Sequence, residues 1–197
     1  MGREIADVMS FEHGALWLDR PERNVEELPN RLFDVLDLNP SAVVADIGSG
    51  TGFFTLLLAE TLPHGRVYSV EVLPTLIDTL AARSARLGFR NVTPVLGTEM
   101  SPNLPQNKMD LALIVASYHE FTYPREMIQS ILDSLKPGAR LVVVEYRLED
   151  ETIGVSDAHR MSEAQIRKEI ESVGLVWRET RDVLPQQHVM IFNRPRD

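Results

Sequence analysis

Two patterns of apolar residues alternate along the chain. Short apolar runs rich in β-branched residues are typical of buried strands, whereas apolar residues that recur every three or four positions are typical of helices. The helical pattern fills most of the intervals between the runs, and Pro74 and Pro124 stand where two of these helices begin. The strand pattern occurs in seven runs: residues 43–47, 66–71, 91–96, 109–116, 139–146, 175–181 and 188–193.

The order of these elements predicts the fold. Five strands that alternate with helices require right-handed crossovers and form a parallel sheet. The last two runs are joined only by residues 182–187, and so short a link allows only an antiparallel pair. We therefore expect an α/β protein, a three-layer αβα sandwich whose doubly wound, seven-stranded sheet is mostly parallel with an antiparallel last strand.

Local patterns also predict where two helices begin. Asn24 and Glu27 have the spacing of a capping pair, and Pro29 requires the helix there to start late or to kink. Ser162 and Gln165 have the spacing of a capping box at the start of the last helix.

Three glycines follow the first predicted strand at alternate positions. Gly48, Gly50 and Gly52 come after Asp46, and the apolar pattern of a helix begins at once. A backbone without Cβ atoms lets a ligand lie directly against it, and the first N–H groups of a helix point at that ligand. A nicotinamide-type fingerprint would need its third glycine where Phe53 stands, and no phosphate-loop lysine follows the glycines. The pattern therefore indicates a ligand-binding turn of another class.

A second acidic residue ends the second predicted strand. Glu71 lies 19 residues after Gly52, close to the roughly 20-residue spacing at which a carboxylate accepts hydrogen bonds from ribose hydroxyls. We therefore expect a ligand that contains a nucleoside.

Four motifs in register resemble the class I S-adenosylmethionine-dependent methyltransferases. They are the glycine loop with the acids around it, and residues 91–98, 110–115 and 135–141. The resemblance extends over about residues 30–193, and it implies S-adenosylmethionine as the cofactor and S-adenosylhomocysteine as the product. It also implies that residues 1–23 form a lid over the cofactor and that residues 24–197 form one methyltransferase domain.

Ligands of doubly wound sheets bind at the carboxyl ends of the strands, and this rule together with the resemblance selects the cofactor residues. By resemblance the glycine loop holds the methionyl part, Glu71 the ribose, and Thr98 with Glu99 the adenine edge. Many members of the family carry an acid where Thr98 stands, so either Glu99 replaces it or the backbone alone makes this contact. The expected set is Asp46, Gly48, Ser49, Gly50, Thr51, Gly52, Glu71, Val72, Gly97, Thr98, Glu99 and Ala116.

The residues that follow the fourth and fifth predicted strands are the candidates for catalysis. Methyl transfer from a sulfonium is an in-line displacement, which depends mainly on alignment of the acceptor. Tyr118 and His119 follow the fourth strand, where the resembled family places acceptor-side residues. They either line the pocket, or His119 acts as a base because histidine titrates near neutral pH. Glu145, at the end of the fifth strand, either faces the acceptor or is a solvated acid.

The other histidines have structural alternatives. His13 and Trp17 either close the lid or belong to a docking helix. His159 either contacts the substrate or takes part in local capping, and His188 is expected to be structural.

A metal site is not expected from the spacing of the ligand-type residues. His13, His119, Glu120 and Glu145 are of the types that bind zinc or iron. Their spacing matches no metal motif. The sequence therefore predicts no metal ligands.

Composition bears on location and partners. The 197 residues suit a single domain, and zero cysteines remove disulfides, thiolate zinc sites and cysteine nucleophiles, as expected of a protein in a reducing cytoplasm. A net charge of −9 argues against a nucleic-acid partner. No apolar run approaches the length of a membrane span.

The acceptor of the methyl group is expected to be a small molecule. The chain has no insertion large enough to form a domain that recognises a macromolecule. Two alternatives stay open: a protein that binds S-adenosylmethionine or S-adenosylhomocysteine without catalysis, and a protein methyltransferase. The sequence does not indicate the oligomeric state.

Overall fold

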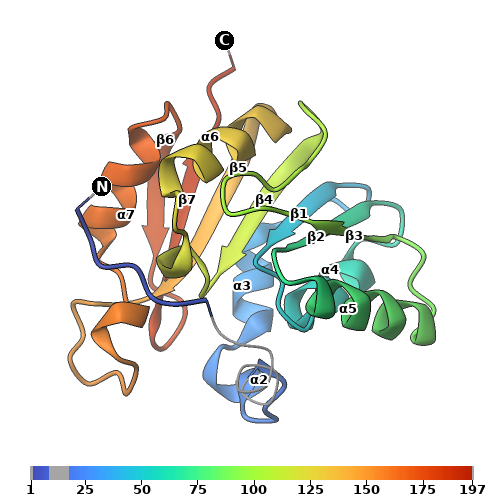
Figure 1. The fold of residues 1–197 in the computed structure, drawn as a ribbon, viewed down its shortest axis with the longest axis horizontal. Helices are drawn as coiled ribbons and strands as arrows, with labels where there is room; N and C mark the ends of the chain where they lie inside the picture. Colours follow the sequence, from blue (N-terminus) through green and yellow to red (C-terminus); the bar gives the residue numbers. More distant parts are fainter. Residues whose placement is uncertain (1, 9–17, 197) are drawn as a thin grey trace.

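The structure, a computed structural model, describes residues 2–8 and 18–196. Its centre is one seven-stranded sheet (Figure 1). Each of the seven predicted runs forms one strand. The strands are β1 (Val43–Ile47), β2 (Arg66–Glu71), β3 (Val92–Leu96), β4 (Met109–Val115), β5 (Leu135–Tyr146), β6 (Val176–Arg181) and β7 (Gln187–Asn193).

The strand order is β3-β2-β1-β4-β5-β7-β6. The first five strands pair in parallel, and β7 is antiparallel to both β5 and β6. The chain leaves β1 toward β3 and then returns to place β4 on the other side of β1. This reversal is the switch point at which ligands of doubly wound sheets bind. The predicted fold is confirmed.

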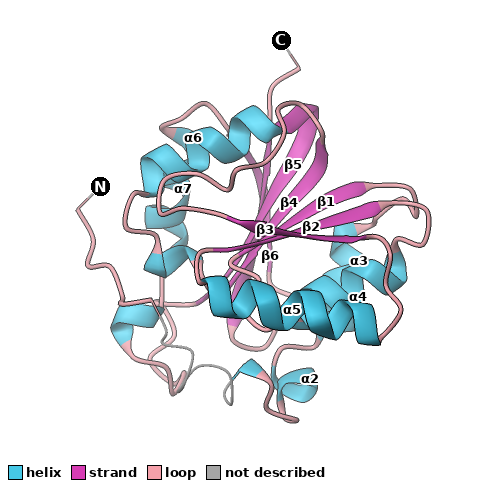
Figure 2. Ribbon diagram, turned by 45° about the vertical axis from the view of Figure 1, so that its right-hand side comes forward, coloured by secondary structure: helices cyan, strands magenta, loops and turns pink. Residues whose placement is uncertain are grey.

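Helices cover both faces of the sheet (Figure 2). On one side lie α3 (Pro29–Leu36), α4 (Phe53–Thr61) and α5 (Pro74–Arg86), and on the other lie α6 (Pro124–Ser134) and α7 (Glu163–Glu171). Alternate residues of β4 enter two separate hydrophobic clusters because successive side chains of a strand point to opposite faces. Leu111, Leu113 and Val115 belong to one cluster, and Ala112 and Ile114 to the other.

Within residues 2–8 and 18–196 the structure also has the short helix α2 (Arg23–Glu26) and the 3-10 helices η1 (Tyr118–Glu120) and η2 (Asp157–His159). The predicted capping pair near α2 is wrong, because Asn24 lies inside that helix and Glu27 forms an ion pair with Arg23. α3 begins at Pro29, which confirms the late start.

The last helix and the fifth strand differ in detail from prediction. Ser162 caps α7 by accepting a hydrogen bond from the backbone N–H of Gln165, whereas the Gln165 side chain donates to Glu169. β5 begins directly after α6, at Leu135, because Leu135 pairs with Met109 across an irregularity in the register. The strand therefore starts four residues before the predicted run 139–146.

The N-terminal residues pack against the carboxyl side of the sheet. Ala6 donates its backbone N–H to the carbonyl of His119, and Arg3 reaches both η1 and α7. His13 and Trp17 lie outside the described residues. In the part of the chain that the structure describes, no helix has the length and apolar character needed to cross a membrane.

Candidate functional site

A pocket opens at the carboxyl ends of β1, β2 and β4, at the switch point of the sheet. Its floor is the glycine loop after β1, and its walls come from the residues that follow β2 and β4. Three residues from the N-terminal part of the chain, Val8, Leu18 and Arg23, also line it. The pocket thus combines segments far apart in the sequence.

The glycine loop has the geometry that its sequence predicts. Gly48, Gly50 and Gly52 have φ angles of +70°, +55° and +89°, a region that favours residues without a Cβ atom. A Cβ on Gly48 would lie 2.5 Å from Ser117 Oγ, and one on Gly52 would lie 2.2 Å from Leu80 Cδ1. These two glycines are therefore required by the packing of the protein itself.

Gly50 and Ser49 face the pocket. A Cβ on Gly50 would lie 3.0 Å from Cδ1 of Leu18, which also lines the pocket. Ser49 Oγ is buried and has no hydrogen-bond partner within residues 2–8 and 18–196. A buried hydroxyl without a partner is costly, so this atom is suited to meet a polar group of a ligand.

Glu71 connects the glycine loop to the loop after β2. Its Oε2 accepts from the Gly50 backbone N–H at 3.0 Å, and its Oε1 accepts from the N–H groups of Val72 at 2.6 Å and Leu73 at 3.3 Å. An ionised carboxylate has about four lone-pair sites. It can therefore hold both loops and still accept about one further hydrogen bond, from a hydroxyl of a ligand.

Asp46 places a second acid beneath the glycine loop. The side chain is buried, and its Oδ2 accepts a hydrogen bond from Thr55 Oγ1 at 2.6 Å. Burial raises the pKa of Asp46 to about 6, against the opposing effect of the Thr55 hydrogen bond. Above that pH the carboxylate is a buried negative charge at the pocket, which favours a cationic ligand.

Only one of the three residues expected near the adenine lines the pocket. Glu99 lines the pocket, whereas Gly97 and Thr98 are not among the described lining residues. Thr98 Oγ1 instead accepts from the backbone N–H of Ser101 at 3.0 Å, and the Gly97 N–H donates to the Glu71 carbonyl. Thr98 therefore stabilises the turn of residues 98–101.

Thr51 attaches the N-terminal part of the chain to the loop. Its Oγ1 donates to Asp19 at 2.9 Å, and Arg83 bonds both Asp19 and the Thr51 carbonyl. Thr51 and Gly52 are not among the described lining residues, whereas Asp46, Gly48, Ser49, Gly50, Glu71, Val72, Glu99 and Ala116 are.

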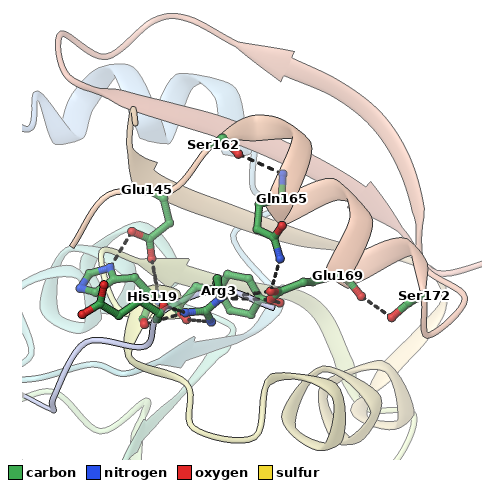
Figure 3. Close-up of polar contacts among 9 residues, drawn as sticks. Arg3, His119, Glu145, Ser162, Gln165, Glu169 and Ser172 are labelled. Carbon is green, nitrogen blue, oxygen red and sulfur yellow. Dashed lines mark hydrogen bonds and ion pairs between the residues drawn. The ribbon is translucent and has the colours of Figure 1, made fainter. Parts of the chain in front are cut away.

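The three predicted catalytic residues lie behind the pocket wall. Glu145 is fully buried and accepts from the Tyr118 N–H at 2.6 Å and from His119 Nδ1 at 2.8 Å (Figure 3). Burial disfavours a charged imidazole, but the negative charge and hydrogen bond of Glu145 outweigh it and raise the pKa of His119. Among the described residues, Tyr118, His119 and Glu145 do not line the pocket, while their neighbours Ser117 and Glu120 do.

A buried network behind the wall involves residues that the sequence pattern did not single out. Glu169 on α7 accepts from Arg3 Nε at 3.1 Å, from the Tyr118 hydroxyl at 2.8 Å and from Gln165 at 2.7 Å (Figure 3). Arg3 also donates to the backbone carbonyls of Tyr118 and His119. The N-terminus therefore fixes the loop after β4.

Arg23 is a further residue of the site that the sequence pattern did not indicate. Its side chain is 7% exposed and forms an ion pair with Glu27 at 2.8 Å. The guanidinium also lies over the rings of Phe53 and Phe54, at 4.4 and 5.2 Å from their centroids. The sequence offered only the spacing of Arg23 four positions before Glu27, a pattern that is common on helix surfaces.

The fold and the pocket together define the class I S-adenosylmethionine-dependent methyltransferases. A family model described as a methyltransferase domain matches residues 38–190. The chain belongs to this methyltransferase family, whose cofactor is S-adenosylmethionine.

Relatives with similar sequences are protein-L-isoaspartate O-methyltransferases. The protein from Pyrococcus horikoshii is 30% identical over 112 residues, 57% of this chain and 48% of the relative. The protein from Aeropyrum pernix is 32% identical over 117 residues, 57% of this chain and 42% of the relative. The chain thus matches less than half of the length of these two relatives.

Solved structures show the same fold. A SAM-dependent methyltransferase from Aquifex aeolicus has a TM-score of 0.88 at 21% identity, and the match covers 94% of this chain and 99% of that one. The cyclase SpnF has a TM-score of 0.72 at 19% identity, with 84% and 81% covered. Because a cyclase shares the architecture, the reaction has to be argued from the site.

Proposed function

We propose that the chain binds S-adenosylmethionine in this pocket and transfers its methyl group to a small neutral or cationic acceptor. The observation that carries the proposal is the convergence of Asp46, the glycine loop and Glu71 on one pocket at the switch point. The same convergence supports S-adenosylhomocysteine as the product that leaves it.

The residues present fit the cofactor. Ser49 Oγ is a buried polar atom without a partner in the described chain, and a side chain at Gly50 would crowd Leu18 in the pocket lining. We assign these two residues to the methionyl part, Glu71 to the ribose hydroxyls and Glu99 to the adenine. Asp46 supplies negative charge for a cofactor that carries a sulfonium and an ammonium group.

The charge of the pocket favours a neutral or cationic acceptor. Four acids line it, Asp46, Glu71, Glu99 and Glu120, and Arg23, the cation among the described lining residues, is already paired with Glu27. An anionic acceptor would enter against these charges. The wall after β4, formed by Ser117 and residues 120–122, is the side that we assign to the acceptor.

The chemistry demands little from the protein beyond alignment. The sulfonium is an activated methyl donor, and correct placement of the acceptor in line with it is worth about 7–11 kcal/mol. We propose that Glu145 and Tyr118 are positioning residues, because their hydrogen bonds fix the loop that carries Ser117 and Glu120. A role for His119 as a base stays a prediction.

A protein carboxylate is the second candidate acceptor. The named relatives support it, since they are protein-L-isoaspartate O-methyltransferases of about 30% identity. The acidic pocket opposes it, because the carboxylate of an isoaspartyl residue is negatively charged at neutral pH.

Transfer of a tritiated methyl group separates these candidates. Purified protein is incubated with labelled S-adenosylmethionine and either a panel of small phenols, alcohols and amines or a peptide that contains isoaspartate. We expect label on a member of the panel and none on the peptide, with Gly50→Val as the inactive control. Label on the peptide alone would establish the protein acceptor. Cofactor binding without transfer to any acceptor would favour a binding protein.

A further inference from the structure

Two loops bring three potential metal ligands together beside the pocket. His119 and Glu120 lie on η1, and His159 lies on η2. The imidazole nitrogens and carboxylate oxygens that these residues offer lie within 4.8 Å of one another. The rings of His119 and His159 meet edge to face with centroids 5.1 Å apart. The three residues are therefore close enough to share one ion.

Glu145 prepares His119 for a role as a ligand. Its Oε2 is 2.8 Å from His119 Nδ1, and its Oε1 accepts from the Tyr118 N–H (Figure 3). The opposite nitrogen, His119 Nε2, is 4.0 Å from Glu120 Oε1. A buried carboxylate that holds one imidazole nitrogen so that the other faces a metal is a recurrent arrangement, and it fixes both the tautomer and the ring orientation.

We propose that His119, Glu120 and His159 bind one divalent transition-metal ion. Two imidazoles and one carboxylate suit Zn²⁺ or Fe²⁺ and leave coordination positions open. Bonds of about 2.0–2.2 Å to Zn²⁺ place tetrahedral ligand atoms roughly 3.4 Å apart. The ligand atoms, which lie within 4.8 Å of one another, therefore have to approach by up to about 1.4 Å. This change is within reach of side-chain rotation because Glu120 and His159 are only partly buried.

The surrounding charges are compatible with a cation. Glu120 and the buried Glu145 together offset the two positive charges of the ion. Arg3 lies nearby, but its guanidinium is bonded to Glu169 and to backbone carbonyls.

An ion bound to Glu120 would lie at the wall of the pocket. Glu120 lines the wall that we assign to the acceptor. An ion held there would bind an oxygen or nitrogen of an acceptor and increase its acidity as a Lewis acid. Binding of the ion itself does not depend on the proposed methyl transfer, so the two proposals are tested separately.

The test is calorimetric titration of the full chain, free of any affinity tag, with Zn²⁺, repeated with Co²⁺ and followed by its visible absorption. We expect one ion to bind per chain. We also expect bound Co²⁺ to show the intense visible absorption bands of a low coordination number. His159→Ala and Glu120→Gln are each expected to weaken Zn²⁺ binding at least about tenfold. His64→Ala, which removes an exposed imidazole outside the cluster, is expected to bind as the unchanged protein does.

Binding of S-adenosylhomocysteine serves as the folding control for His159→Ala, because His159 is not among the described pocket residues. No Zn²⁺ or Co²⁺ binding by the unchanged protein would overturn the proposal. Equal binding by a folded His159→Ala variant would also overturn it, since the ion would then lie elsewhere.

Discussion

Replacement of Asp46 by asparagine is expected to stabilise the protein at neutral pH. Asp46 is buried beneath the glycine loop, and its carboxylate accepts one hydrogen bond from Thr55 in place of a hydration shell. Asparagine has nearly the same shape and retains an oxygen that accepts from Thr55. The substitution therefore removes a buried charge without creating a cavity.

The magnitude follows from the pKa of Asp46, which rises from 3.8 to about 6 on folding. At about 1.4 kcal/mol per pKa unit, ionisation of the folded protein costs about 3 kcal/mol at neutral pH. This cost already includes the favourable effect of the Thr55 hydrogen bond on the carboxylate. The expected gain for Asp46→Asn is therefore up to about 3 kcal/mol, or roughly 6–12 °C in Tm for a domain of this size.

The gain in stability from Asp46→Asn depends on pH. Because the pKa in the folded state lies above that in the unfolded state, the contribution of Asp46 to stability is fully present below about pH 4 and is lost as the pH rises through about 6. The Asp46→Asn variant does not lose stability in this way, because asparagine does not ionise. The gain in stability is therefore expected at about pH 8 and not at about pH 4.

Urea unfolding of both proteins at about pH 4 and about pH 8 measures these differences. Asp78→Asn, an exposed change on α5, is the matched control and is expected to have little effect. Equal destabilisation by Asp46→Asn at both pH values would refute the reasoning. It would show that the carboxylate is not a buried charge of the folded protein.

Three other variants test the site and its support. Glu71→Gln is expected to weaken S-adenosylhomocysteine binding at least about tenfold by calorimetry, because a charge-assisted contact is lost; unchanged affinity would remove Glu71 from the site. Gly50→Val is expected to abolish that binding, whereas Gly88→Val, which also has a positive φ but open space around it, is expected to bind normally. Arg3→Met is expected to lower the free energy of unfolding by about 3 kcal/mol, since it leaves the buried Glu169 without its ion pair; an unchanged urea midpoint would contradict this.

The strands and the glycine loop could be predicted because their signals are local. β4 is apolar from Leu111 to Val115 and is buried on both faces of the sheet, and the three glycines follow β1 directly. Glu71 follows from a fixed spacing in a strand–helix–strand unit. Each of these inferences needs only neighbours in the sequence.

The walls of the pocket could not be predicted in the same way. Val8 and Leu18 reach the pocket through the packing of the N-terminal residues, and Thr98 is used by a turn that its sequence does not signal. His159 meets His119 only because η2 packs near η1, so no linear metal motif exists to be found. Such contacts depend on tertiary structure, which overrides local pattern.

Calorimetric titration of the full chain with S-adenosylhomocysteine, with NAD as the control, tests whether the pocket binds this cofactor. We expect binding of one molecule of S-adenosylhomocysteine per chain with micromolar affinity and no binding of NAD. Binding of NAD, or of neither compound, would show that the glycine loop, Asp46 and Glu71 do not form a site for this cofactor.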